Sequence, residues 1–203
     1  MNPSLFIHMC LKKSENVMEA FNMKNLTLTL VACFCLFFAG PGFAQDLTPE
    51  LKAKLEAKIK DCAVWLADAK IVDAVKAANT APSAEAKDMT NDKWKELTLL
   101  DPIVRSFSKN AAGEFLKSKK DDVLCEAFVN AADGSKVAFL AKTTAWNHKG
   151  KEKHDLPMAG TNWFGKIEVD ESTGKQQVQV GLPVKDGDKV IGTAVLGFDV
   201  SKL

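Results

Sequence analysis

Three short turn signals after Asp122 restrict the fold of this chain more than any other feature. Asp133-Gly134, Glu171–Gly174 and Asp186-Gly187 each separate two segments rich in Val, Leu, Ile and Phe. Turns this short join neighbouring antiparallel strands, because a parallel connection needs a crossover of a dozen or more residues. We therefore expect an antiparallel sheet over 123–203, with strands at 123–131, 136–143, 166–170, 176–184 and 189–200.

Helical patterns come before these strands, and one long connection, 144–163, lies between the second and the third. Thr48-Pro49-Glu50 is a helix start, and the apolar residues that follow recur at intervals of three and four. One long helix is predicted over 48–78, and a helical connector over 84–122. Because the helices and strands are segregated along the chain, the predicted class is α+β.

The N-terminal region has the pattern of an export signal. Met23-Lys24 precedes an apolar run, Leu26–Phe38, and small residues follow up to Ala44. The run is too short to span a membrane, so we expect a signal peptide over 23–44, cleaved after about Ala44. Residues 1–22 are then a start-site extension, and 45–203 form one periplasmic or secreted domain. An alternative stays open, since Cys33 ends a lipoprotein-like processing site.

Charge and motifs exclude several classes of function. The chain has 27 basic and 26 acidic side chains and a net charge of +1, which argues against a nucleic-acid partner. It contains no haem-attachment motif, no Gly-x-Ser-x-Gly elbow, no phosphate-binding glycine loop and no His-Glu-x-x-His. We therefore expect no cofactor, no metal and no enzymatic activity.

Two cysteines, Cys62 and Cys125, remain once the predicted leader is removed. In an oxidising compartment they could form a disulfide that stabilises the domain by about 2–4 kcal/mol. The alternative is a pair of buried thiols, because a domain of this length needs no covalent link. The sequence leaves both open.

Four segments carry a resemblance to a known family. They are Glu126–Gly134, Val137–Trp146, Gln179–Gly192 with its Pro-Val and Val-Ile-Gly elements, and Leu196–Leu203 with its Gly-Phe-Asp. Together they resemble the single Cache domains, which are extracytoplasmic PAS-like sensor domains. The resemblance implies a long N-terminal helix on a five-stranded antiparallel sheet, and a pocket for a small organic acid or amino acid beneath the crossover.

The chain also departs from the family. It carries no membrane helix or transmitter after the sheet, so it is most similar to the stand-alone periplasmic members. It contains no Tyr, so the Tyr-rich amino-acid pocket of the double-Cache relatives is not complete here.

The predicted binding residues lie around the crossover. Lys142 offers a charge, Thr144 a hydroxyl and Trp146 a wall with an N–H donor, which together suit a small carboxylate. Solvent exposure of His148, core packing of Trp163 and a structural hydrogen bond of Asp199 remain open alternatives. The whole predicted set is Phe139, Lys142, Thr144, Trp146, His148, Trp163 and Asp199.

These features lead to two hypotheses of function. The first is a sensor-type domain that binds a small anionic metabolite and passes the signal to a partner, either a membrane receptor or a second copy of the chain. The second is a non-catalytic interaction module, either dimerising or docking on a receptor, whose pocket is vestigial and filled by side chains. A cavity beneath residues 142–164 would distinguish them.

Overall fold

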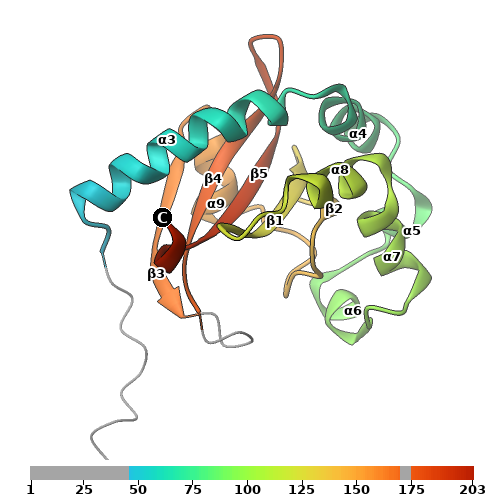
Figure 1. Cartoon of the computed structure of the whole chain (residues 1–203). Helices are drawn as coiled ribbons and strands as arrows, with labels where there is room; N and C mark the ends of the chain where they lie inside the picture. Colours follow the sequence, from blue (N-terminus) through green and yellow to red (C-terminus); the bar gives the residue numbers. More distant parts are fainter. Residues whose placement is uncertain (1–45, 170–174) are drawn as a thin grey trace, which may run out of the picture. The chain divides into compact units, whose positions relative to one another are not determined.

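The computed structural model describes residues 46–169 and 175–203 (Figure 1). The predicted extension, the signal peptide with Cys33 and its cleavage site after Ala44, and the predicted turn at 171–174 lie outside the described residues. Within the described part, no helix is long and apolar enough to cross a membrane. The helices are α3 (Pro49–Leu66), α4 (Ala69–Thr80), α5 (Ala84–Lys87), α6 (Asn91–Glu96), α7 (Pro102–Lys109), α8 (Ala111–Lys119), α9 (Glu152–Met158) and the 3-10 helix η1 (Val200–Lys202).

The five strands form one antiparallel sheet. They are β1 (Leu124–Ala131), β2 (Lys136–Phe139), β3 (Trp163–Val169), β4 (Gln176–Asp186) and β5 (Lys189–Asp199), in the spatial order β2-β1-β5-β4-β3. All four neighbouring pairs are antiparallel. The last strand therefore lies in the middle of the sheet. This confirms the predicted α+β class and the PAS-like five-stranded sheet.

Two predicted strand boundaries differ from the structure by three residues or more, and the others agree within two residues. The second strand ends at Phe139 and not at 143, because the chain beyond it leaves the sheet and packs on Trp94, whose Nε1 donates to the Thr143 carbonyl at 2.7 Å. The third strand begins at Trp163 and not at 166, since Trp163 already pairs with Gly181 of β4. Trp163 is thus part of the sheet.

The predicted single helix over 48–78 is wrong in one respect, because it is two helices. Thr48 caps α3 as expected, and its Oγ1 accepts a hydrogen bond from the Leu51 N–H. The helix then ends at Leu66, and Asp68 caps a new helix by accepting from the Lys70 N–H at 2.9 Å. Both helices bury apolar residues against the same core, so the apolar pattern continues across the break and hides it.

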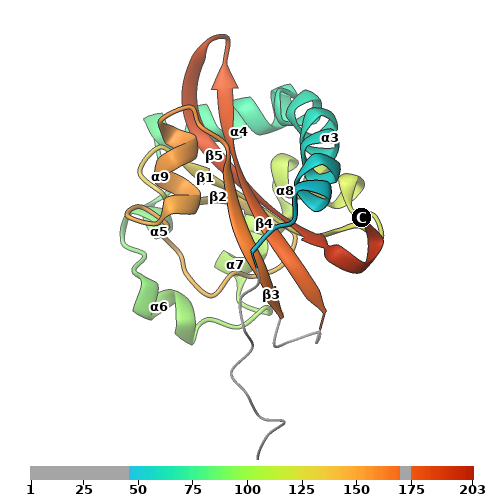
Figure 2. The same ribbon diagram turned by 90° about the vertical axis from the view of Figure 1, so that its left-hand side faces the viewer.

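The two faces of the sheet have different covers. Helices α3, α4 and α8 pack on one face, where Val178, Val180 and Leu182 point into the main core. Helix α9 lies on the opposite side of the sheet from α3 (Figure 2). A second core on that side is built around Trp94 of α6 and Val104 of α7.

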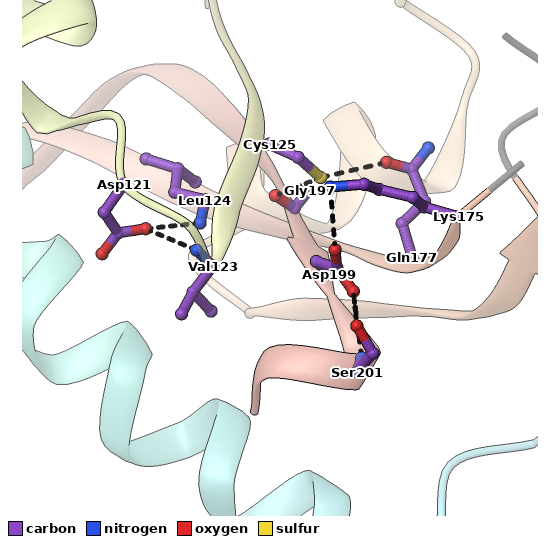
Figure 3. Close-up of polar contacts among 9 residues, drawn as sticks. All are labelled: Asp121, Val123, Leu124, Cys125, Lys175, Gln177, Gly197, Asp199 and Ser201. Atoms are coloured by element: carbon purple, nitrogen blue, oxygen red, sulfur yellow. Dashed lines mark hydrogen bonds and ion pairs between the residues drawn. The ribbon is translucent and has the colours of Figure 1, made fainter. Parts of the chain in front are cut away.

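The possible disulfide between Cys62 and Cys125 is not present. Cys62 is buried in the main core on the α3 side, where burial raises the pKa of its thiol to about 11. The Cys125 Sγ instead lies 3.2 Å from the Gly197 carbonyl and 3.4 Å from Gln177 Oε1 (Figure 3). Gln177 alternates with Val178 along β4, so the two cysteines face opposite sides of the sheet and cannot reach disulfide geometry.

Candidate functional site

Helix α9 rests directly on strand β4. It lies within the long connection 144–163, whose sequence shows neither helical nor strand periodicity. A Cβ on Gly181 would lie 2.7 Å from the Lys153 carbonyl oxygen and 2.9 Å from Cγ of Pro157. Only a glycine permits this approach of the two backbones. The first turns of α9 are thereby held over the sheet, and they bring Lys153 and His154 to its polar face.

A buried polar cluster lies beneath this crossover. The Lys136 ammonium donates to Asn130 Oδ1 at 2.8 Å and lies 2.6 Å from Nδ1 of His148. Asn130 donates in turn to the Thr193 hydroxyl at 3.1 Å, and that hydroxyl lies 2.9 Å from Nδ1 of His154. All five side chains are between 0% and 4% exposed. The partners of Lys136 are therefore neutral acceptors in a site that excludes water.

Two ammonium groups meet at one aromatic ring. Lys136 Nζ lies 4.2 Å from the centroid of the Phe128 ring, and Lys153 Nζ lies 5.7 Å from it. Lys153 also donates to Gln179 Oε1 at 3.1 Å. Among the described residues, no carboxylate lies within ion-pairing distance of either ammonium. The protein thus brings two amino groups to one ring, with no carboxylate of the described residues in direct contact with either; Glu126 and Glu168 act on Lys153 only from a greater distance.

Burial controls the protonation of this cluster. Burial, followed by the charge of Lys153, lowers the pKa of Lys136 well below its ordinary value, and Glu126 opposes this effect. The pKa of Lys153 is also lowered, again first by burial. Burial and the nearby Lys136 lower the pKa of His148 to about 2, so its imidazole is neutral and its Nδ1 accepts from Lys136.

Next to Lys153, a groove of about 300 Å³ lies between α9, β3 and β4. Trp163 forms a wall of the groove: its ring lies over Gly165, where a Cβ would be 2.9 Å from Cη2, and its Nε1 donates to Glu152 at 3.3 Å. Glu126 accepts from the Gln179 amide at 2.6 Å, beside Gly197, which leaves room for the glutamate side chain. The lining residues are Lys151, Glu152, Lys153, Trp163, Gly165, Lys166, Glu168, Gln177 and Gln179. Lys153 links the groove to the cluster, because it lines the groove and its ammonium lies near the Phe128 ring.

The structure brings two of the seven predicted site residues to this region. His148 belongs to the buried cluster and Trp163 to the groove. Phe139 and Trp146 instead pack with Trp94 in the second core, at ring-centroid distances of 5.8 and 5.2 Å.

The other three lie elsewhere. Lys142 lies over the Trp94 ring at 4.9 Å, and Thr144 is exposed. Asp199 is buried at the end of β5, where it accepts from the Ser201 N–H and hydroxyl and pairs with Lys175 at 3.2 Å (Figure 3). These contacts, with Ser201 the largest, hold its pKa below the ordinary value. Asp199 therefore fixes the turn into η1 and does not face the groove.

Sequence reasoning missed four polar residues of the cluster, Lys136, Asn130, Thr193 and His154, and also Lys153 beside it. Asn130 and Thr193 carried a signal, because each is a polar residue within an otherwise apolar, fully buried strand segment. A polar group buried in this way requires a partner. No group of three His, Cys, Asp or Glu within 46–169 and 175–203 is placed to hold a metal ion.

Comparisons with known proteins give similarity in fold only. No protein-family model matches the chain, and no curated protein matches it. Among solved structures, the sensor domain of the V. cholerae histidine kinase DctB aligns with 15% identity and a TM-score of 0.43, over 75% of this chain and 53% of that chain. The ligand-binding domain of the Pseudomonas aeruginosa amino acid chemoreceptor PctC, in complex with GABA, aligns with 15% identity and a TM-score of 0.37, over 78% and 61%.

A third structure, the sensory domain of the Campylobacter jejuni chemoreceptor Tlp3 with isoleucine bound, aligns with 13% identity and a TM-score of 0.35, over 77% of this chain and 65% of that one. The chain therefore spans between about half and two thirds of the length of these structures. All three are sensor, sensory or ligand-binding domains, the class that the resemblance to Cache domains implies. At these values the function has to be argued from the side chains of this chain.

Proposed function

We propose that this domain binds a small anionic metabolite reversibly, with the carboxylate of the ligand over the Phe128 ring between Lys136 and Lys153. The observation that supports this most strongly is the pair of ammonium groups at one ring, without a carboxylate partner among the described residues. Two like charges repel each other in a site of low dielectric, and an anion between them removes that cost. The rest of the ligand extends along the groove toward Trp163.

The proposed role is that of an extracytoplasmic sensor. Lys136 comes from β2 and Lys153 from α9, so a carboxylate held by both connects the crossover to the sheet. The ligand then favours the conformation in which α9 is seated on β4, and a partner reads that conformation. Binding shifts a conformational equilibrium only by the difference in affinity for the two states. The partner would be a membrane receptor or a second copy of this chain, in the periplasm or outside the cell.

One observation favours the alternative of an interaction module. In the part of the chain that the structure describes, no buried side-chain nitrogen or oxygen lacks a hydrogen-bond partner. The cluster around Lys136 is thus internally satisfied and has the character of a pocket filled by its own side chains. In this alternative the polar cluster is structural, and the domain acts through its surface.

A binding screen distinguishes the two. The gently purified protein is examined by native mass spectrometry for a retained small acid, and then by thermal shift with propionate, succinate, malate and glutamate. A ligand at a hundredfold excess over its Kd raises the apparent stability by about 2.7 kcal/mol. Lys153→Met should reduce the shift. The matched control is Lys142→Met, because this lysine also lies over an aromatic ring, Trp94, but in the second core. No retained acid and no shift with any probe would favour the interaction module.

A further inference from the structure

Lys136 is the most enclosed charged side chain of the site. It is 2% exposed, and its ammonium has Asn130 and His148 as hydrogen-bond partners, both of them neutral. The Phe128 ring lies beneath it at 4.2 Å. None of these groups carries a negative charge, so nothing in direct contact compensates a proton on this lysine.

The charged and titratable groups around Lys136 come from several elements. Glu126 faces it from β1, and Lys153 and His154 face it from α9. On the outer side of β2, Lys70 and Asp73 of α4 line a groove that Lys136 also lines. Glu126 is the one carboxylate among the groups on the Phe128 side, and its Oε2 accepts a hydrogen bond from the Gln179 amide. On the side of the Phe128 ring, the surroundings of Lys136 are therefore cationic or neutral except for Glu126, which is not in direct contact with it.

This arrangement makes the protonation of Lys136 depend on what occupies the site. In the unliganded protein, burial and the Lys153 charge disfavour the ammonium form and lower the pKa of Lys136. A carboxylate within hydrogen-bonding distance has the opposite effect, because it favours the charged form. The two states of the site thus hold the same proton with different affinity.

We infer that binding of a carboxylate ligand is coupled to the uptake of one proton by Lys136, so that the affinity of the site for the anion falls as the pH rises. This inference rests on the proposed function and adds to it the control of the site by pH. Below the pKa of the unliganded lysine the proton is already present, and the affinity does not depend on pH. Above it, the affinity falls about tenfold for each pH unit, until the pH reaches the pKa of the lysine in the complex.

Other groups of the site do not account for such an uptake. The His148 imidazole has a pKa of about 2 and stays neutral over the range in which the protein is folded and assayed. Lys153 is only half-buried, donates to the side-chain oxygen of Gln179, and has Glu126 and Glu168 near enough to favour its charged form. Lys136 combines nearly complete burial with a place at the ring where the carboxylate is proposed to bind.

Calorimetry tests the coupling directly. Succinate and propionate are the probes, and each is titrated into the full-length protein in phosphate and in Tris buffer, from about pH 6 to about pH 10. The two buffers differ in ionisation enthalpy, so the difference in heat counts the protons taken up. We expect uptake approaching one proton, with a parallel loss of affinity toward high pH. Lys142→Met is the control, since this lysine lies over Trp94 in the second core and its loss should leave affinity and uptake unchanged. Lys153→Met should weaken binding and move the onset of the uptake to higher pH, because the Lys153 charge lowers the pKa of Lys136.

A second measurement avoids dependence on a substitution of Lys136, which can fail to fold. The Cε resonance of Lys136 in ¹³C-lysine-labelled wild-type protein is followed against pH, without ligand and with saturating succinate or propionate. We expect the titration midpoint to move to higher pH in the complex. Binding of a probe with no proton uptake and an unmoved midpoint would overturn the coupling and leave the proposed function intact. Absence of heat with both probes, together with no thermal shift across the panel, would overturn the proposed function and the coupling with it.

Discussion

Gly181→Ala tests whether α9 is seated on the sheet as the structure places it. The new methyl group would lie 2.7 Å from the Lys153 carbonyl oxygen, a backbone atom that no side-chain rotation can move. The helix therefore has to shift away from β4, and overpacking of this kind costs about 1–3 kcal/mol. The shift also strains the hydrogen bond between His154 and Thr193, which is 2.9 Å long. We expect lower stability and weaker anion binding in the same variant.

The assay is urea denaturation followed by tryptophan fluorescence, with anion binding measured separately. Each kcal/mol lost lowers the Tm by about 2–4 °C for a domain of this size. Gly165→Ala is the matched control on the neighbouring strand β3. Its Cβ would meet Cη2 of the Trp163 side chain, which can move, at 2.9 Å, and its nearest backbone atom, the Gln179 carbonyl oxygen, lies farther off at 3.1 Å. The reasoning is refuted if Gly181→Ala is as stable as the wild type, or if Gly165→Ala is the more damaging of the two.

Three further outcomes are expected. Trp94→Phe removes the 2.7 Å hydrogen bond to the Thr143 carbonyl in the second core, so the free energy of unfolding should fall by about 1–3 kcal/mol. An unchanged free energy of unfolding in urea denaturation would contradict this contact. Asp199→Asn should destabilise the protein at neutral pH. The difference should begin to shrink as the pH falls below about 4, the ordinary pKa of an aspartate in the unfolded chain, and should vanish once the pH is below the lowered pKa of Asp199 in the folded protein; a pH-independent difference in thermal scans would refute this. Cys62 should resist a thiol reagent at neutral pH until the protein unfolds, since its pKa is about 11, and rapid labelling of the folded protein at Cys62 would contradict its burial.

Much of the fold follows from local patterns. The glycine turn at 186–187 and the alternation of Val178, Val180 and Leu182 against Gln177 and Gln179 predict the β4–β5 hairpin and its two faces. The helix start at Thr48 follows from its cap. The break at Asp68 was missed, because a capping aspartate within a continuous apolar pattern is not distinguishable from a solvent-facing one.

The candidate site depends on a feature that periodicity does not show. In a regular ladder that pairs Phe128 with Phe139, Asn130 would lie opposite Val137 and Lys136 would point to the other face. A bulge after Val129 instead places Lys136 opposite Asn130. Partners across two strands share a face, so the bulge turns the lysine from the main core side to the polar side. One extra residue in the register therefore decides whether this charge belongs to the site.

The same sheet can hold both a stable core and a polar cluster because its two faces are covered independently. The face under α3, α4 and α8 buries the apolar members of each strand and needs no ligand. The other face carries Asn130, Lys136 and Thr193, and the crossover with α9 covers them at the Gly181 contact. A substitution where α9 packs on the sheet should thus alter binding at a moderate cost in stability. A substitution in the main core should instead unfold the whole domain, including the polar cluster. If the proposed function holds, the separation of these two effects lets a domain of this size respond to a small anion without unfolding.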